Sequence, residues 1–175
     1  ELDLNPHPVD LIGEHFDLAF RMGALANDAS LVARKIGEHR FGLYASPIYL
    51  ALHRPPRQPE DLLQHVAVRL LSASAQPVKW QLIRGKTKWE GLAPGRIAVN
   101  SPGVIRQLLL EGAGIGALPD SFALEDLQLR RLVRVLPEWR LPATPVWAVM
   151  PTRRFLPAKT RAFLLHIEKF MQSDQ

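Results

Sequence analysis

Asn100 and Ser101 combine residue types and a position that could bind a ligand. They stand between a short apolar run, residues 97–99, and a helical run that begins at Pro102. Serine is a favourable N-cap, and proline suits the first helical position because its missing N–H is not needed there. The free N–H groups at such a helix start could hold an anion or a small polar ligand. The alternative is that Ser101 only caps its own helix.

Arg21, Met22 and Gly23 form a second candidate segment. The residues before Gly23 alternate apolar and polar, which predicts a strand ending at this glycine. An arginine at the carboxyl end of a strand lies where α/β sheets place ligands, and it can bind a carboxylate through two hydrogen bonds. The alternative is a structural ion pair with Asp17 or Asp28.

Ser46 and Trp147 complete the candidate set. Ser46 precedes a proline and a short predicted helix, so it repeats the cap signature and could serve only as a cap. Trp147 lies in a predicted strand, residues 146–150, that follows a proline-rich link. It could wall a cleft, although a buried core tryptophan is the more common outcome. The candidate ligand-binding residues are therefore Arg21, Met22, Gly23, Ser46, Asn100, Ser101 and Trp147.

The other residues show no catalytic or metal-binding pattern. The six histidines are scattered without ligand spacing, and the absence of cysteine excludes a thiolate metal site, a cysteine nucleophile and a disulfide framework. There is no HExxH, GxSxG or phosphate-loop motif. The glycines in residues 112–116 follow a helix and open a strand, the reverse of a dinucleotide fingerprint, so they predict a helix end and close strand packing. We expect no catalytic residue, no metal and no cofactor.

The predicted elements that position these residues are alternating strands and helices. Strand 97–99, helix 102–111 and strand 115–118 predict a right-handed βαβ unit. Residues 78–90 predict an antiparallel hairpin, and residues 157–171 predict a final amphipathic helix. The alternation predicts the α/β class with a largely parallel sheet.

Composition excludes several classes of protein. The 175 residues are 47% hydrophobic and 22% charged, which favours a folded core over disorder. No apolar run is long enough to span a membrane, and the first residues do not form a signal peptide. The formal net charge is +5, but basic residues occur only in pairs, so we do not expect this segment to read DNA. The lack of cysteine fits a cytoplasmic protein.

Several segments together resemble the effector-binding domain of LysR-type transcriptional regulators. They include VDLIGEHFDLAFRMG (9–23), LVARKIGEHRFGLYASPIYLALH (31–53) and VNSPGVIRQLLLEGAGIGALPD (99–120). The HxxxRL pattern at 65–70, LVRVLPEW at 132–139 and LPAKTRAFLLHI at 156–167 follow the same family order. The resemblance covers essentially the whole chain.

This resemblance implies an architecture. The family has two Rossmann-like α/β lobes hinged by two crossover strands, similar to type 2 periplasmic binding proteins. Lobe one would comprise residues 1–44 and 146–175, and lobe two residues 45–145. The candidate residues would face the cleft between them. Against the family pattern, we expect that the DNA-binding winged helix, and the first strand and helix of lobe one, are absent from this chain.

The resemblance also implies a function. The family binds a small-molecule effector between its lobes, forms homodimers or homotetramers, and binds DNA through the N-terminal domain. We therefore expect a cytoplasmic regulatory domain that is not an enzyme, binds no membrane and takes an anionic or aromatic effector. One alternative is a solute-binding protein of a transport system, which shares the fold. Another is an enzyme of the same architecture, for which the sequence offers no acid, base or nucleophile set.

Overall fold

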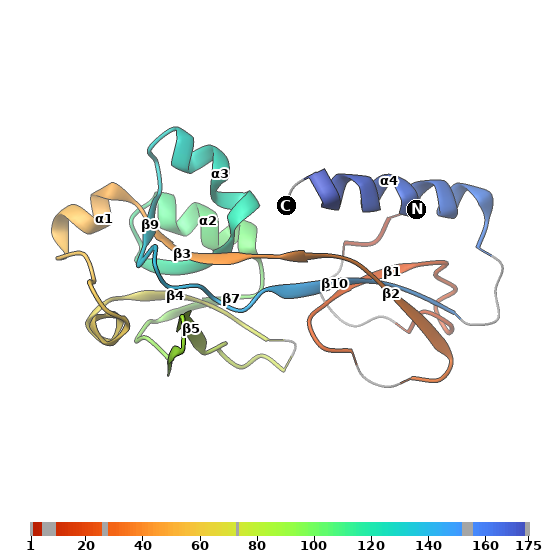
Figure 1. The fold of residues 1–175 in the computed structure, drawn as a ribbon, viewed down its shortest axis with the longest axis horizontal. Coiled ribbons are helices and arrows are strands. Elements are labelled where there is room, and N and C mark those ends of the chain that lie inside the picture. The colour runs from red at the N-terminus through yellow and green to blue at the C-terminus, as the bar shows by residue number, and fades with distance from the viewer. Residues whose placement is uncertain (1, 5–9, 26–27, 73, 152–155, 174–175) are drawn as a thin grey trace. The chain divides into compact units, whose positions relative to one another are not determined.

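The computed structural model describes residues 2–4, 10–25, 28–72, 74–151 and 156–173, which group into two compact units. The larger unit contains residues 40–142 together with residues 2–4, and the smaller contains residues 10–39 and 143–173. The elements, labelled in Figure 1, are β1 (Ala19–Met22), β2 (Leu31–His39), β3 (Phe41–Ala45), α1 (Pro47–Leu52), η1 (Pro59–Gln64, a 3-10 helix), β4 (Ala67–Leu70), β5 (Trp80–Arg84), β6 (Thr87–Gly91), β7 (Ile97–Val99), α2 (Pro102–Leu110), β8 (Ile115–Pro119), α3 (Asp120–Gln128), β9 (Val133–Val135), β10 (Thr144–Pro151) and α4 (Ala158–Ser173).

A five-stranded mixed sheet organises the larger unit. Its order is β7-β4-β8-β3-β9, with β4 parallel to both of its neighbours and β3 antiparallel to both of its own. The α/β class is thus confirmed, but the prediction of a largely parallel sheet was wrong. The alternation of strands and helices along the chain does not set strand direction, which depends on pairing between distant segments; β3 runs opposite to β8 and β9, and the sheet β1-β10-β2 is wholly antiparallel.

The predicted βαβ unit is present as β7, α2 and β8. These two strands are not paired with each other, because β4 lies between them and α2 crosses over it. Helical spacing in α2 predicts one apolar face, formed by Val104, Ile105, Leu108 and Leu109. Ile105 and Leu109 are fully buried, whereas Val104 is 47% exposed. Gly112 ends the helix with φ 78°, and a Cβ at Gly114 would lie 2.3 Å from the Val66 carbonyl oxygen. The helix-end and close-packing interpretation of these glycines is confirmed.

Side chains alternate between the two faces of this sheet. Tyr44 and Val68 belong to a core with α2 and α3, while their neighbours Leu43 and Ala67 belong to a second core on the opposite face. The predicted hairpin, observed as β5 and β6, closes that second face with Trp80 and other apolar side chains. In Figure 1, α2 and α3 lie on one side of the sheet and β5 on the other. Because successive side chains of a strand point to opposite faces, neighbouring residues of β3 and β4 belong to different cores.

The smaller unit is an antiparallel sheet, β1-β10-β2, with α4 along one face (Figure 1). Its core contains Ile36, Val146 and Ala148 from the strands and Leu164 and Met171 from α4. The predicted final helix is confirmed. The alternation of apolar and polar residues over residues 16–22 predicts a strand, which in the structure is shorter and begins at Ala19.

Residues 31–45 predict extended segments interrupted near residues 37–40, and the structure has two strands there, β2 and β3, on either side of Arg40. Residues 2–4 alternate apolar and polar and predict a short strand, but they form none, so that prediction was wrong. Because β3 pairs within the five-stranded sheet, the compact units divide before β3, whereas the predicted lobe boundary falls after Tyr44. The division into two functional lobes stays a prediction.

Candidate functional site

Ser101 lies at the N-cap of α2, the position that the sequence predicts. Its backbone is extended, with φ −125° and ψ 120°, and its carbonyl accepts the first helical hydrogen bond from the Ile105 N–H at 3.1 Å. Its hydroxyl, however, makes no capping hydrogen bond. Asn100, directly before it, is exposed. The Ser101 hydroxyl is therefore available to a ligand rather than committed to its own helix.

The start of α2 can bind a polar or anionic group. The first-turn N–H groups of a helix lack intrahelical partners and carry partial positive charge. Gly103 in this turn is exposed, and a Cβ there would find only the Ser101 Oγ within 4 Å, at 3.7 Å. The approach to these N–H groups is therefore open on the Gly103 side. Together with the Asn100 amide, the turn offers donors for a carboxylate.

Ser46 has a different role. It is 1% exposed, and its Oγ accepts a hydrogen bond from the Tyr49 N–H at 3.3 Å, which caps α1. Because β3 runs antiparallel to β8, and β8 and β7 are both parallel to β4, the carboxyl ends of β3 and β7 lie at opposite edges of the sheet. Ser46 follows β3 and lies near the C-terminal end of α2, whereas Ser101 begins α2. The structure therefore separates Ser46 from Asn100 and Ser101.

The structure brings the other candidates together in the smaller unit. Arg21 pairs across the strands with Trp147, whose indole Nε1 donates a 2.9 Å hydrogen bond to the Gly23 carbonyl. The Gly23 N–H donates to the Pro145 carbonyl at 2.9 Å, with φ 86° and open space where a side chain would stand. Met22 is 52% exposed. Trp147 is half-buried, and its indole N–H stabilises the end of β1 through this hydrogen bond.

Electrostatics near Arg21 bear on the ion-pair alternative. Hydrogen bonds from the side chain and backbone of Ser30 lower the pKa of Asp28, and the positive charge of Arg21 lowers it further to a smaller extent. Arg21 thus interacts with one of the two aspartates that the sequence analysis named.

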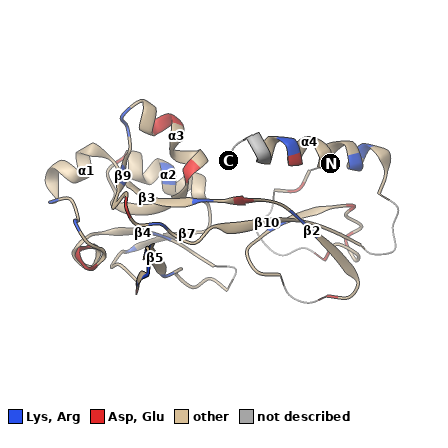
Figure 2. Ribbon diagram, viewed as in Figure 1, with Lys and Arg blue, Asp and Glu red and all other residues tan. Residues whose placement is uncertain are grey.

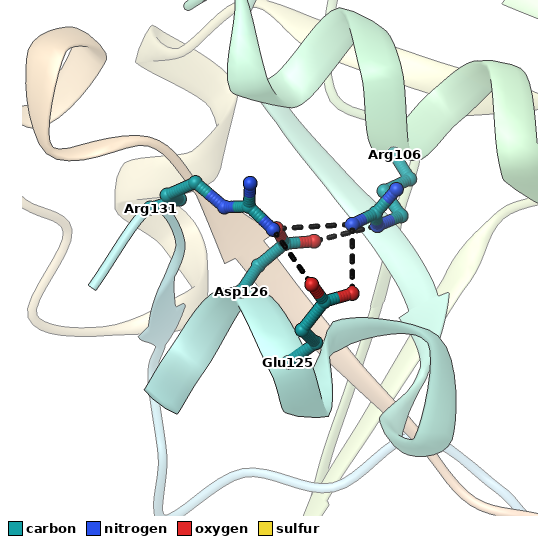
Figure 3. A network of polar contacts seen from close by, with 4 residues as sticks. All are labelled: Arg106, Glu125, Asp126 and Arg131. Atoms are coloured by element: carbon teal, nitrogen blue, oxygen red, sulfur yellow. Dashed lines mark hydrogen bonds and ion pairs between the residues drawn. The ribbon is translucent and has the colours of Figure 1, made fainter. Parts of the chain in front are cut away.

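Sequence reasoning missed a buried ion network in the larger unit. The Asp126 carboxylate is fully buried and accepts Arg106 Nε at 2.6 Å and Arg131 Nη2 at 2.8 Å. Figure 3 shows the two guanidinium groups on either side of this carboxylate, with Glu125 beside them. Asp126 lies three residues after buried Ala123, on the same helical face, and this spacing was the available signal.

Among the described residues, no group of three or more histidine, aspartate or glutamate side chains could hold a metal ion. Within the same ranges, no helix is long and apolar enough to cross a membrane.

Known proteins with similar sequences are transcriptional regulators. The chain is 34% identical over 155 residues to the HTH-type transcriptional regulator PtxR of Pseudomonas aeruginosa, covering 89% of this chain and 49% of that protein. It is 30% identical over 157 residues to the HTH-type transcriptional activator AaeR of Escherichia coli, covering 89% and 50%. The chain thus spans about half the length of the curated relatives it matches. These relatives do not favour the transport alternative.

Solved structures agree with this assignment. The full-length virulence activator AphB of Vibrio cholerae superposes with TM-score 0.81 at 31% identity, covering 98% of this chain and 57% of that one. The regulatory domain of CrgA, a LysR-type transcriptional regulator of Neisseria meningitidis, superposes with TM-score 0.78 at 26% identity, covering 93% and 79%. The family model of the LysR substrate binding domain matches residues 1–172. The chain therefore belongs to the LysR-type transcriptional regulators, of which it carries mainly the substrate-binding domain.

Proposed function

We propose that the chain senses a small organic effector for a bacterial transcriptional regulator and is not itself an enzyme. The observation that carries this proposal is the start of α2, where the Ser101 hydroxyl makes no capping bond and the first helical turn is exposed at Gly103. Such a turn favours an anionic group, so the proposed effector is a small carboxylate, aliphatic or aromatic.

The family supports a two-lobed arrangement of the binding residues. In this proposal Asn100 and Ser101 bind the effector from lobe two, residues 45–145. Arg21, Met22, Gly23 and Trp147 contribute from lobe one, residues 1–44 and 146–175. Ser46 is left out of this set, because its hydroxyl is buried and caps α1.

We place DNA binding outside these 175 residues, because the relatives are named for a helix-turn-helix and are about twice as long. Effector binding would alter DNA binding through a rearrangement of subunits in a homodimer or homotetramer. A regulator acting on chromosomal DNA in this way would work in the cytoplasm.

A thermal-shift screen of small aliphatic and aromatic carboxylates tests the proposal. A ligand at 100 times its Kd raises the free energy of unfolding by about 2.7 kcal/mol, which is readily measured as a higher Tm. Ser101→Ala should reduce the shift produced by an active compound. Ser121→Ala, a serine in α3 of the same unit, should leave that shift unchanged. Flat melting curves across the carboxylates, with intact folding, would contradict the proposal.

A further inference from the structure

A pocket with a volume of about 440 Å³ lies in the larger unit, at the opposite end of α2 from Ser101. Its walls are the first turn of α1, the C-terminal half of α2 and the segment that follows α3. This volume is within the usual range for small-molecule sites. Nothing in the effector site proposed above uses this pocket, so its role stands independently.

Three arginines line the pocket: Arg106, Arg130 and Arg131. Arg106 and Arg131 share the buried carboxylate of Asp126, and both lie near the exposed carboxylate of Glu125, at 3.7 Å and 3.3 Å (Figure 3). Two carboxylates therefore face these two guanidinium groups. The Asp126 contacts also hold both guanidinium groups in place, since charge-assisted bonds to a buried carboxylate are strong.

Arg130 contributes the charge that this network does not match. Its guanidinium makes no hydrogen bond or ion pair with the part of the chain that the structure describes, and the residue is exposed. Glu111 also lines the pocket, but it is exposed and accepts a hydrogen bond from the Gln107 amide at 3.3 Å. In Figure 2, the blue turn after α3 lies next to the red segment of that helix. Counted with Glu111, the three arginines stand near three carboxylates, but the Arg130 guanidinium pairs with none of them in the described part of the chain, so it can bind the carboxylate of a ligand.

The backbone at Arg130 is unusual for an arginine. The Arg130 N–H donates to the Leu127 carbonyl and the Arg131 N–H to the Asp126 carbonyl, which together form the Schellman motif that ends α3. Arg130 occupies the left-handed position of this motif, with φ 56°, where glycine is the usual residue. An arginine at this position therefore carries a conformational energy cost that glycine would avoid. The Arg130 side chain lines the pocket.

The remaining wall is apolar. Pro47, Ile48 and Leu110 line it, and Ile48 is 66% exposed. An apolar group seated here would cover this surface. We propose that this pocket binds a small monocarboxylate with an apolar body, its carboxylate on Arg130 and Arg131 and its body against Ile48 and Leu110.

Titration of the 175-residue chain with hexanoate, followed by amide NMR shifts, tests this proposal. Hexanoate should give saturable shifts at Ser46, Gln107, Arg130 and Arg131, with a Kd that rises as salt screens the charges. Hexanamide, its neutral counterpart, should bind about tenfold more weakly, because it lacks the charge-assisted bond. Acetate should also bind more weakly than hexanoate, because it cannot cover the apolar wall.

Variants separate this pocket from the effector site and from folding defects. Arg130→Gln should raise the hexanoate Kd about tenfold, while Arg96→Gln, an exposed arginine outside the pocket, should not. Arg130→Gly should also weaken binding yet melt at a higher temperature, since glycine relieves the backbone at this position. Lost binding in a more stable variant cannot come from unfolding.

Three results would overturn the proposal. One is a hexanoate Kd that Arg130→Gln leaves unchanged. Another is hexanamide binding as tightly as hexanoate. Shifts confined to Asn100 and Ser101, abolished by Ser101→Ala, would also overturn it, while supporting the effector site proposed above.

Discussion

The phenol of Tyr49 lies 3.1 Å from Nδ1 of His65, and both residues are buried. The Tyr49 oxygen accepts the Val66 N–H at 3.0 Å, so its own proton is directed to the imidazole. The backbone carbonyl of Arg54 acts to raise the pKa of His65. A neutral imidazole with Nδ1 as the acceptor fits the Tyr49 and Val66 contacts. Protonation at Nδ1 would place the imidazole N–H against the Tyr49 O–H, and the hydrogen bond between them would be lost.

The stability of the larger unit should therefore fall in mild acid. Burial lowers the pKa of His65, nearby His53 lowers it further, and Asp61 acts in the opposite direction. Because the pKa in the folded state is below the unfolded value of about 6.5, the contribution of His65 is complete above that pH. It is lost as pH falls from there through the folded pKa.

Urea unfolding between pH 8 and pH 5 measures this effect. At pH 8, His65→Gln should cost about 1 kcal/mol, the net value of one hydrogen bond. Below pH 6.5 the variant should lose stability less steeply than the wild type. His166→Gln, at an exposed position on α4, should follow the wild-type slope. Equal slopes for wild type and His65→Gln would exclude His65 as the cause.

Asp126→Asn should destabilise the fold. It removes the buried negative charge that Arg106 and Arg131 share, but both arginines are partly exposed and can turn to water. We therefore expect a loss of about 2 to 3 kcal/mol in the free energy of unfolding, at the lower end for a broken buried ion pair. Neighbouring Glu125→Gln, whose side chain is 70% exposed, should cost less than about 0.5 kcal/mol. Denaturant melts giving similar losses for both variants would show that burial of Asp126 does not matter.

Ser46→Ala and Ser101→Ala should differ in their effects on stability. The Ser46 hydroxyl is buried and caps α1, so its loss should cost about 1 to 2 kcal/mol. The Ser101 hydroxyl makes no capping bond, so its loss should cost less than about 0.5 kcal/mol. Thermal melts of the two variants in the absence of ligand provide the comparison. A large loss for Ser101→Ala would restore the capping interpretation.

Gly114→Ala should destabilise the larger unit strongly. A Cβ here would approach the Val66 carbonyl oxygen to 2.3 Å, and φ is 150°. Backbone strain and steric overlap together should cost about 3 kcal/mol or more, measured by urea unfolding. Gly85→Ala is the control: it has φ 57° but nothing within 4 Å, so only the backbone cost of about 1 kcal/mol should appear. Equal losses would mean that the backbone at Val66 moves aside.

Local sequence signals predict the elements that form the candidate site. Ser101 and Pro102 mark the start of α2, Gly112 its end and Pro119 the end of β8, because caps, positive φ and missing N–H groups act within a few residues. The family resemblance added the class of protein, which no single motif carried.

Contacts between distant segments determine which of these residues lie close together. Ser46 and Ser101 carry the same local signature, yet β3 runs against β7, so they lie at opposite edges of the sheet. The pairing of Arg21 with Trp147 joins residues 126 positions apart through strand register. The burial of Asp126 between two arginines follows from how α2 and α3 pack. Strand direction, register and packing are set by contacts between distant segments, so local pattern does not contain them.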